Sequence, residues 1–310
     1  MLSLRMLLLP KKVTIDKQAS LMRSEVSTKK YKMNIILFLN KDLEANLTYN
    51  LLKEELLKHR VKIYYSESVG KQNTKPKDLL AVEYYEKEYI YKELVPAIKQ
   101  AQIATSFEFF DVDFKTFEIA KCTNPNKSEF IEAVRAFEPD LFISIRFAKI
   151  FREEIIKVPK KGILNLHSAI LPDYRGIFGT LHNLKDNKAL YGCTLHYISS
   201  RGIDTGEIIS IVRKPIDKKK SLLWHVLTLY PLGARLILES IQKLATFDRL
   251  PCLLQDNSAG SYFSVPTAAH FEQLKALGFT IFDAVDYQEL LEQFISSDVG
   301  RILNPLTLPD

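Results

Sequence analysis

Residues 162–176, GILNLHSAILPDYRG, combine an apolar strand-like run with an amide and an imidazole two positions apart. Alternate residues of a strand point to the same face, so Asn165 and His167 would project together from the end of the run. An amide N–H and an imidazole N–H that lie side by side can stabilise the negative charge developing on a carbonyl oxygen under attack. The spacing therefore favours chemistry that passes through an oxyanion.

A carboxylate near the imidazole would orient the ring and favour its charged form. The best candidate is Asp204, which lies between Gly202 and Gly206 in a loop that follows a second strand-like segment. An isolated Asn-x-His at a strand end is more often a satisfied polar pair than a catalytic one, and an aspartate between glycines is a common turn. Their combination with the Leu171-Pro172 step is more specific than either feature alone.

Strands and helices alternate along the chain, which predicts an α/β domain with a mostly parallel, twisted sheet. Ligands of such sheets bind at the carboxyl ends of the strands. We expect strands at 34–39, 61–66, 107–114, 141–145, 163–167, 191–198, 207–214 and 262–265. We expect helices at 43–60, 89–104, 128–137, 177–188 and 221–247, the last one bent at Pro231, and an irregular loop at 67–88.

Alternation along 191–198 places His196 on the side of the sheet that carries the polar pair. His196 could therefore line the same site, although packing is the commoner role for a lone histidine. We expect packing or surface roles for His59, His182, His225 and His270.

Positive charge is concentrated at the start of the chain. The formal net charge is +6, and residues 1–32 alone hold eight Lys/Arg and two Asp/Glu. The remaining chain is formally neutral, which disfavours a nucleic-acid binder, because such affinity rests on clustered cations. We expect residues 1–32 to be a disordered basic extension, with Met33 as an alternative start.

The lengths of the apolar runs and the spacing of the cysteines indicate the cellular compartment. No apolar run approaches the roughly 18 residues that a membrane-spanning helix needs. Cys122, Cys193 and Cys252 are odd in number and far apart, which argues against a disulfide framework and a structural zinc site. We therefore expect a cytoplasmic protein with no membrane partner and no metal site.

Several segments resemble the folate-dependent formyltransferases. Residues 165–176, NLHSAILPDYRG, are similar to the family signature Asn-x-His-x-Ser-Leu-Leu-Pro-x-x-x-Gly. Residues 192–209, GCTLHYISSRGIDTGEII, resemble the second half of that signature. Residues 139–151 resemble the strand and folate-site loop before it, and residues 221–237 resemble the closing helix. The family includes glycinamide ribonucleotide, methionyl-tRNA and sugar N-formyltransferases.

The resemblance implies a Rossmann-like formyltransferase domain at 33–247 and a short C-terminal extension at 248–310. It also implies that Asn165, His167 and Asp204 form the catalytic trio, and that the formyl donor is 10-formyltetrahydrofolate. The pteridine of the donor would lie among Phe147, Lys149, Ile150, Phe151, Arg201, Gly202 and Ile203.

On this interpretation a neutral amine attacks the formyl carbon. Asn165 and protonated His167 would stabilise the oxyanion, and losing one such donor typically lowers the rate by about 10²–10³-fold. Asp204 would keep His167 charged and help to remove the proton of the amine. Ala169 departs from the signature, because it replaces a serine whose hydroxyl could cap the following turn. We also hypothesise that Pro172 follows a cis peptide bond.

The acceptor is the least determined part of the prediction. Methionyl-tRNA formyltransferases carry a C-terminal barrel for tRNA, whereas residues 248–310 are few and not basic, which disfavours a nucleic-acid partner. We therefore expect a small amine acceptor, first of all an amino-sugar nucleotide. Two alternatives stay open: a 10-formyltetrahydrofolate hydrolase, although Thr205 departs from the glutamate usual there, and a non-catalytic folate- or nucleotide-binding module. The apolar C-terminal helix and tail could form the face of a homodimer.

Overall fold

The structure is a computed structural model that describes residues 32–67, 75–110 and 116–303, and the structural statements below concern these residues. The predicted basic extension at 1–32 lies outside the described residues, except for its last one. Residues Lys32–Asp310 form one compact unit. Within the described ranges, no helix combines the length and the apolar character needed to cross a membrane.

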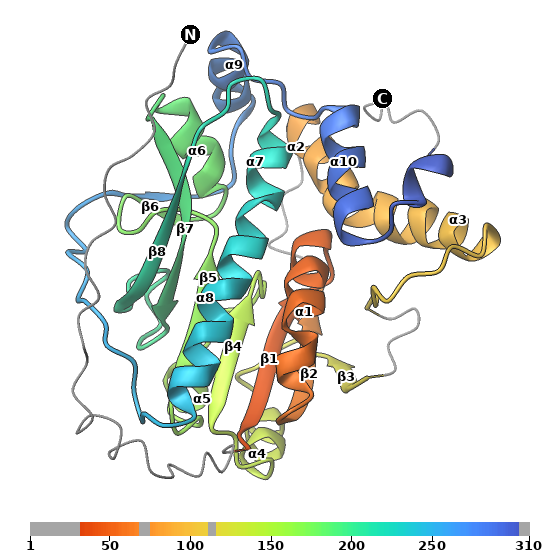
Figure 1. Cartoon of the computed structure of the whole chain (residues 1–310). Helices are drawn as coiled ribbons and strands as arrows, with labels where there is room; N and C mark the ends of the chain where they lie inside the picture. Colours follow the sequence, from red (N-terminus) through yellow and green to blue (C-terminus); the bar gives the residue numbers. More distant parts are fainter. Residues whose placement is uncertain (1–31, 68–74, 111–115, 304–310) are drawn as a thin grey trace, which may run out of the picture. The chain divides into compact units, whose positions relative to one another are not determined.

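A seven-stranded sheet forms the centre of the described unit, in the order β3-β2-β1-β4-β5-β7-β8 (Figure 1). The strands from β3 to β5 are parallel, whereas β7 pairs antiparallel with β5 and β8 pairs antiparallel with β7. The predicted α/β class with a mostly parallel sheet is confirmed. The strands are β1 (Asn34–Asn40), β2 (Arg60–Ser66), β3 (Glu118–Lys121), β4 (Leu141–Ile145), β5 (Ile163–His167), β7 (Leu190–Tyr197) and β8 (Ile208–Pro215).

Helices connect the strands and cover the sheet. The parallel strands need crossover connections, which most of these helices supply. The elements are α1 (Leu43–Leu56), α2 (Lys77–Glu83), the π-helical turns η1 (Tyr84–Glu88) and η2 (Ile90–Leu94), α3 (Val95–Gln100), α4 (Ser128–Arg135), α5 (Glu153–Ile156), α6 (Gly179–Lys185), α7 (Leu222–Leu227), α8 (Leu229–Leu244), α9 (Ala268–Ala276), α10 (Ala284–Phe294) and the 3-10 turn η3 (Val299–Arg301).

Alternation along β1 divides the core between the two faces of the sheet. Ile35, Leu37 and Leu39 belong to the apolar cluster that includes α1 and α8, which lie side by side in Figure 1. Ile36 and Phe38 belong to a second cluster with α4 and α5. Both faces are therefore covered by helices, which is typical of buried parallel strands.

One predicted loop and one predicted helix differ from the structure. Residues 77–88, which we expected in an irregular loop, form α2 and η1, and their apolar side chains Leu79, Val82 and Tyr85 are buried. The interleaved lysines and glutamates concealed this apolar face. The helix expected at 221–247 is divided at Thr228 into α7 and α8.

One predicted strand was also misplaced. Residues 107–110 of the strand expected at 107–114 form no strand, and 111–115 lie outside the described residues. The edge strand is β3 instead, which pairs with β2. The aromatic side chains of Phe107, Phe109 and Phe110 are buried without belonging to a sheet, so β propensity was misleading here.

The C-terminal residues pack directly against the sheet unit. β9 (Ser261–Phe263) pairs in parallel with β6 (Tyr174–Gly176) and forms a second, two-stranded sheet. Leu253 also exchanges two backbone hydrogen bonds of 2.8 Å with Ile208 at the edge of β8. The predicted boundary after residue 247 stays a prediction.

Candidate active site

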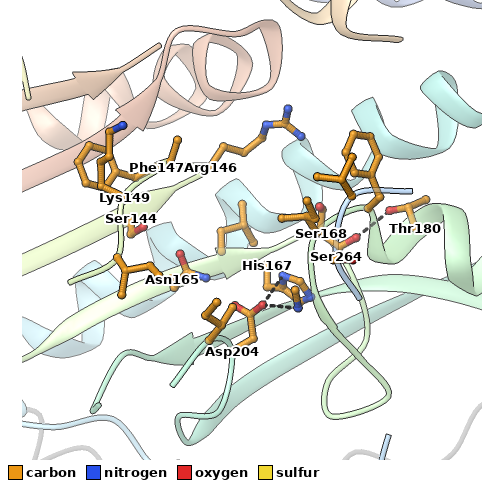
Figure 2. A pocket seen from close by; sticks show the side chains of 18 of the residues that line it. Ser144, Arg146, Phe147, Lys149, Asn165, His167, Ser168, Thr180, Asp204 and Ser264 are labelled. Atoms are coloured by element: carbon orange, nitrogen blue, oxygen red, sulfur yellow. Dashed lines mark hydrogen bonds and ion pairs between the residues drawn. The ribbon is translucent and has the colours of Figure 1, made fainter. Parts of the chain in front are cut away.

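The sheet brings the predicted trio to the carboxyl end of β5. Asn165 and His167 occupy alternate positions of this strand and project from one face, whereas Leu164 and Leu166 are buried in the core on the other. The loop between β7 and β8 carries Asp204 back to the same strand end. Figure 2 shows the three polar side chains lining one pocket.

Both ring nitrogens of His167 face oxygen atoms that can accept a hydrogen bond. Nε2 lies 2.6 Å from the backbone oxygen of Tyr174, and Nδ1 lies 3.6 Å from Oδ2 of Asp204. The His167 side chain is buried, so water competes little for these contacts. Because a backbone oxygen can only accept, Nε2 of His167 carries a proton, and Nδ1 faces the carboxylate of Asp204.

Asp204 is a buried carboxylate with several partners. The backbone N–H of Gly176 donates to Oδ2 at 2.8 Å, and Nε2 of His196 lies 3.4 Å from Oδ1. Burial raises the pKa of Asp204, but the charge of His167 and the contacts with His196 and the Gly176 N–H outweigh it and lower the pKa from 3.8 to about 2. Asp204 is therefore ionised at neutral pH. Its backbone is left-handed, with φ 53°, and the Gln255 side chain donates to its carbonyl oxygen at 3.0 Å.

The turn after β5 is stabilised by two threonine hydroxyls. Thr180 donates to the backbone oxygen of Ser168, and Thr194 donates to that of Ala169, both at 2.7 Å. The predicted cis bond before Pro172 is present. These hydroxyls stabilise the turn that a serine at the position of Ala169 was expected to cap.

His196 lies beside the trio, as alternation along β7 suggested. It stands opposite Asn165 in the β5–β7 ladder, and its Nε2 lies 3.0 Å from Nδ2 of Asn165. Its Nδ1 lies 2.8 Å from the backbone oxygen of Tyr197. The side chain is 1% exposed. The polar end of β5 therefore has two imidazoles beside it, that of His167 on the same strand and that of His196 on β7.

A cavity of about 540 Å³ opens in front of these groups, a volume that suits a small organic ligand. One wall is made by the β4–α5 and β7–β8 loops. It carries every residue that the resemblance assigned to the pteridine: Phe147, Lys149, Ile150, Phe151, Arg201, Gly202 and Ile203. The rings of Phe147 and Phe151 stack with centroids 5.4 Å apart. Ile150 and Ile203 are 56% and 38% exposed, so the wall presents apolar surface to an incoming ligand.

The opposite end of the cavity was not predicted. It is lined by α2, η1 and the segment around β9, with Lys75, Leu79, Glu83, Glu86, Lys87, Tyr262, Ser264 and Val265. Lys75 and Glu83 form an ion pair of 2.7 Å, whereas Lys87 forms no ion pair within the described ranges. No local sequence pattern brings these distant segments together, so only the fold could reveal this end.

Comparison with known proteins finds a family model that matches the central part of the chain. Residues 73–223 match the family model described as formyl transferase. The match covers slightly less than half of the chain, and in this segment the chain is similar to the formyl transferases. The predicted resemblance is therefore confirmed.

The individual relatives of this chain are distant. The methionyl-tRNA formyltransferase of Syntrophomonas wolfei is 29% identical over 145 residues, which cover 47% of this chain and 46% of the relative. That of Caldicellulosiruptor saccharolyticus is 30% identical over 117 residues, covering 38% and 37%. The chain thus matches less than half the length of these curated relatives. A 4-N formyltransferase from Francisella tularensis shares the fold with a TM-score of 0.51 at 14% identity, covering 76% of this chain and 77% of that one.

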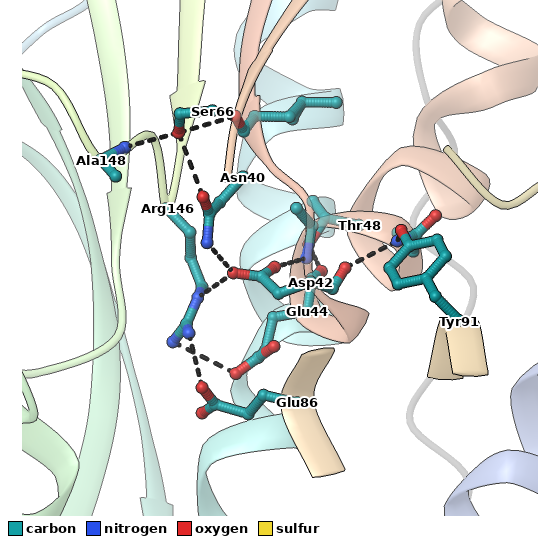
Figure 3. Close-up of polar contacts among 12 residues, drawn as sticks. Asn40, Asp42, Glu44, Thr48, Ser66, Glu86, Tyr91, Arg146 and Ala148 are labelled. Atoms are coloured by element: carbon teal, nitrogen blue, oxygen red, sulfur yellow. Dashed lines mark hydrogen bonds and ion pairs between the residues drawn. The ribbon is translucent and has the colours of Figure 1, made fainter. Parts of the chain in front are cut away.

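A buried charge cluster lies where β1 and β4 end (Figure 3). Nε and Nη2 of Arg146 each lie 2.8 Å from a carboxylate, of Asp42 and Glu86 respectively, and Nη1 lies 3.1 Å from Glu44. Burial raises the pKa of Glu44 well above 4.5, although the Arg146 charge opposes this shift. Asp42 also accepts a hydrogen bond of 2.9 Å from the N–H of Ala45 and so caps α1.

Other reactive side chains of the described residues lie apart from Asn165, His167 and Asp204. The described residues contain no group of three or more His, Cys, Asp or Glu placed to hold a metal ion. Cys122, Cys193 and Cys252 are free thiols. Burial raises the pKa of Cys122 to about 11 and that of Cys193 to about 12, so both are poor nucleophiles.

Proposed function

We propose that this protein transfers a formyl group from 10-formyltetrahydrofolate to the primary amine of a small acceptor. The observation that carries the proposal is the convergence of Asn165, His167 and Asp204 at the end of β5, in front of a cavity of about 540 Å³. An amide, a charged imidazole and a buried carboxylate are the groups that such a transfer needs. The match of residues 73–223 to the formyl transferase family supports the same reaction class.

In the proposed reaction, the acceptor nitrogen adds to the formyl carbon and the formyl oxygen becomes negative. Asn165 donates an N–H to this oxygen, and the positive charge of His167 attracts it. Asp204, ionised and buried, accepts the proton of the attacking amine directly or through water. The bond between the formyl carbon and the donor nitrogen then breaks, and that nitrogen takes up the proton. One C–N bond forms, one breaks, and no oxidant is needed.

For the donor, the wall formed by the β4–α5 and β7–β8 loops supports a pteridine site. Phe147 and Phe151 supply stacked apolar surface, and Ile150 and Ile203 stand exposed at its edge. Aromatic and aliphatic side chains bind a flat heterocycle by burying its faces. Lys149 and Arg201 line the same wall and suit the acidic end of a folate.

For the acceptor, we propose an amino-sugar nucleotide bound at the end formed by α2, η1 and β9. The Lys75–Glu83 and Arg146–Glu86 pairs offer both donors and acceptors, which suits sugar hydroxyls. Lys87, which forms no ion pair among the described residues, suits a phosphate. The N-terminus of α1 is a less favourable phosphate site, because the Asp42 side chain already accepts its free N–H.

A tRNA acceptor is the second candidate, because the curated relatives are methionyl-tRNA formyltransferases. The formally neutral chain beyond residue 32 disfavours it. We also propose a cytoplasmic location, which fits the three free thiols. Homodimer formation stays a prediction.

The test follows tetrahydrofolate release from 10-formyltetrahydrofolate with a panel of amino-sugar nucleotides, amino acids, methionyl-tRNA and no acceptor. We expect release that requires an amino-sugar nucleotide and yields its N-formyl derivative by mass spectrometry. His167→Ala and Asp204→Asn should lower the rate by at least about 10²-fold. His270→Ala, which changes a histidine outside the cavity, is the matched control and should retain the rate.

Each other outcome contradicts the proposal in a different way. Equal release without any amine would make the protein a hydrolase. Formylation of methionyl-tRNA alone would replace the acceptor class. Tight folate binding without turnover, unchanged in Asp204→Asn, would favour a binding module.

A further inference from the structure

The orientation of the Asn165 amide decides whether this side chain can serve an oxyanion. A carboxamide carries two donors at one end and only an acceptor at the other, and the two ends are nearly equal in shape. Turned by half a rotation, Asn165 would present its oxygen to the negative charge and oppose the reaction. Some neighbouring group must therefore select one orientation.

We infer that His196 is a positioning residue that fixes the Asn165 amide with its N–H₂ end available to the reacting oxygen. The inference rests on the proposed formyl transfer, and it adds a residue that acts through Asn165 rather than on the substrate. Its basis is the contact of 3.0 Å between Nε2 of His196 and Nδ2 of Asn165.

The proton arrangement of His196 follows from its other contact. Nδ1 lies 2.8 Å from the backbone oxygen of Tyr197, and a carbonyl oxygen can only accept, so Nδ1 carries the proton. In the neutral ring Nε2 is then a lone-pair acceptor. Such an acceptor can bond only to the N–H₂ end of the Asn165 amide, which excludes the reversed orientation.

Backbone pairing keeps the two side chains together. Asn165 and His196 are direct partners in the antiparallel β5–β7 ladder, where opposite side chains lie on the same face. His196 is 1% exposed, so its ring has little room to turn and water does not replace it. Within the described ranges, no side chain takes the second N–H of Asn165, which leaves that hydrogen for a ligand.

Asp204 lies close enough to compete for His196, and the distances decide between the two partners. Oδ1 of Asp204 lies 3.4 Å from Nε2, whereas Nδ2 of Asn165 lies 3.0 Å from the same nitrogen. Oδ2 of Asp204 also has the Gly176 N–H at 2.8 Å and His167 at 3.6 Å, so the carboxylate has two partners besides His196. The shorter contact assigns His196 to the amide.

Kinetics of four variants test the role. His196→Leu should lower kcat by about 10²-fold, as expected for a misdirected oxyanion donor, and change the KM for the folate donor by less than about threefold. His196→Gln places an acceptor oxygen near the position of Nε2 and should recover at least about tenfold of that loss. In an Asn165→Ala background, His196→Leu should cost less than about threefold more, because the group it positions is gone.

Two kinetic results would overturn the inference. One is a His196→Leu enzyme whose kcat stays within about threefold of wild type. The other is an equal loss from His196→Leu with and without Asn165, which would mean that the two residues act independently. If His196→Leu does not fold, the comparison uses His196→Gln, measured in the wild-type and in the Asn165→Ala background.

A measurement without turnover separates this inference from the proposed function. Nitrogen-15 NMR of histidine-labelled protein at pH 7.5 should show His196 neutral, with its proton on Nδ1. A proton on Nε2 would overturn the positioning role, whatever the activity. A wild-type enzyme that transfers no formyl group, yet shows the Nδ1–H form, would instead refute the proposed function and leave the side-chain geometry standing.

Discussion

The backbone N–H of Gly176 donates to Oδ2 of Asp204 at 2.8 Å, so a glycine of the small β6–β9 sheet orients the carboxylate that follows β7. Gly176 has φ 96°, a conformation that side chains disfavour, and a Cβ there would lie 2.1 Å from the backbone oxygen of Phe263. Glycine is therefore required twice, by the backbone angle and by the neighbouring strand.

We expect Gly176→Ala to lower stability by more than about 2 kcal/mol and to lower kcat, because the chain must shift away from β9 and carry the Asp204 partner with it. Urea unfolding and the formyl-transfer assay measure the two effects. Gly278→Ala is a matched control, since Gly278 also has a positive φ, of 89°, but nothing within 4 Å of an added Cβ. An equal activity loss in the control would argue against the Gly176–Asp204 contact.

Asp204 should also contribute to acid stability. Its folded pKa is about 2 and its ordinary value is 3.8, so its contribution is present above pH 3.8 and is lost as the pH falls through 2. The shift corresponds to about 2 kcal/mol. Asp204→Asn should therefore show less loss of unfolding free energy between pH 4 and 2 than wild type, measured by urea titration. If wild type and Asp204→Asn lost the same unfolding free energy between pH 4 and 2, the lowered pKa of Asp204 would be contradicted.

His182 should make the fold less stable in mild acid. It is buried and stacked on Phe263 at 3.9 Å, and burial, followed by the charges of His270 and Lys185, lowers its pKa to about 4. The unfolded chain therefore binds the proton first, so stability is complete above pH 6.5 and falls as the pH drops toward 4, by up to about 3 kcal/mol.

Replacing this imidazole by an apolar ring should remove the pH dependence. His182→Phe should unfold at nearly the same urea concentration at pH 7.5 and 5, whereas wild type should lose stability between them. His59→Gln serves as a comparison at a second buried histidine. If His182→Phe lost as much stability between pH 7.5 and 5 as wild type, the low pKa of His182 would not be the cause of the pH dependence.

Glu44 should have the opposite effect on the pH dependence of the stability. Its pKa is raised well above 4.5 by burial, so the folded state holds a proton that the unfolded state releases, and stability falls as the pH rises above 4.5. Glu44→Gln keeps the shape and cannot ionise. We expect this variant to be more stable than wild type at pH 8 and to lose the advantage near pH 4.5, measured by thermal or urea unfolding. A destabilised variant at pH 8 would mean that Arg146 needs the Glu44 charge.

Local pattern was sufficient for the central strands and for the polar pair. The apolar runs of β1, β4 and β5 are bounded by turns, and strand alternation alone puts Asn165 and His167 on one face and His196 beside them. Asp204 was a candidate from its place between two glycines after a strand, and the resemblance then assigned it to the trio, because its loop has no periodicity of its own. The cavity does contain all seven residues assigned to the pteridine, but their role in binding stays a proposal.

The local sequence pattern could not predict contacts between residues that are far apart in the sequence. Arg146 meets Asp42 and Glu86 across 104 and 60 residues of sequence, and nothing local marks those carboxylates as its partners. Mixed charge hid the apolar face of α2, so a helix was taken for a loop. Pro231 was expected to bend one helix, but it lies in the first turn of α8, where a missing N–H breaks no helical bond.

The pairing of β6 with β9 also has a consequence for synthesis of the protein. β5, β6 and the loop with Asp204 emerge from the ribosome well before Ser261–Phe263, yet β6 has no other strand partner in the described sheets. A nascent chain that has completed the trio would still lack the strand that supports Gly176. The proposed formyl transfer should therefore become possible only when translation has passed β9, rather than when Asp204 has been added.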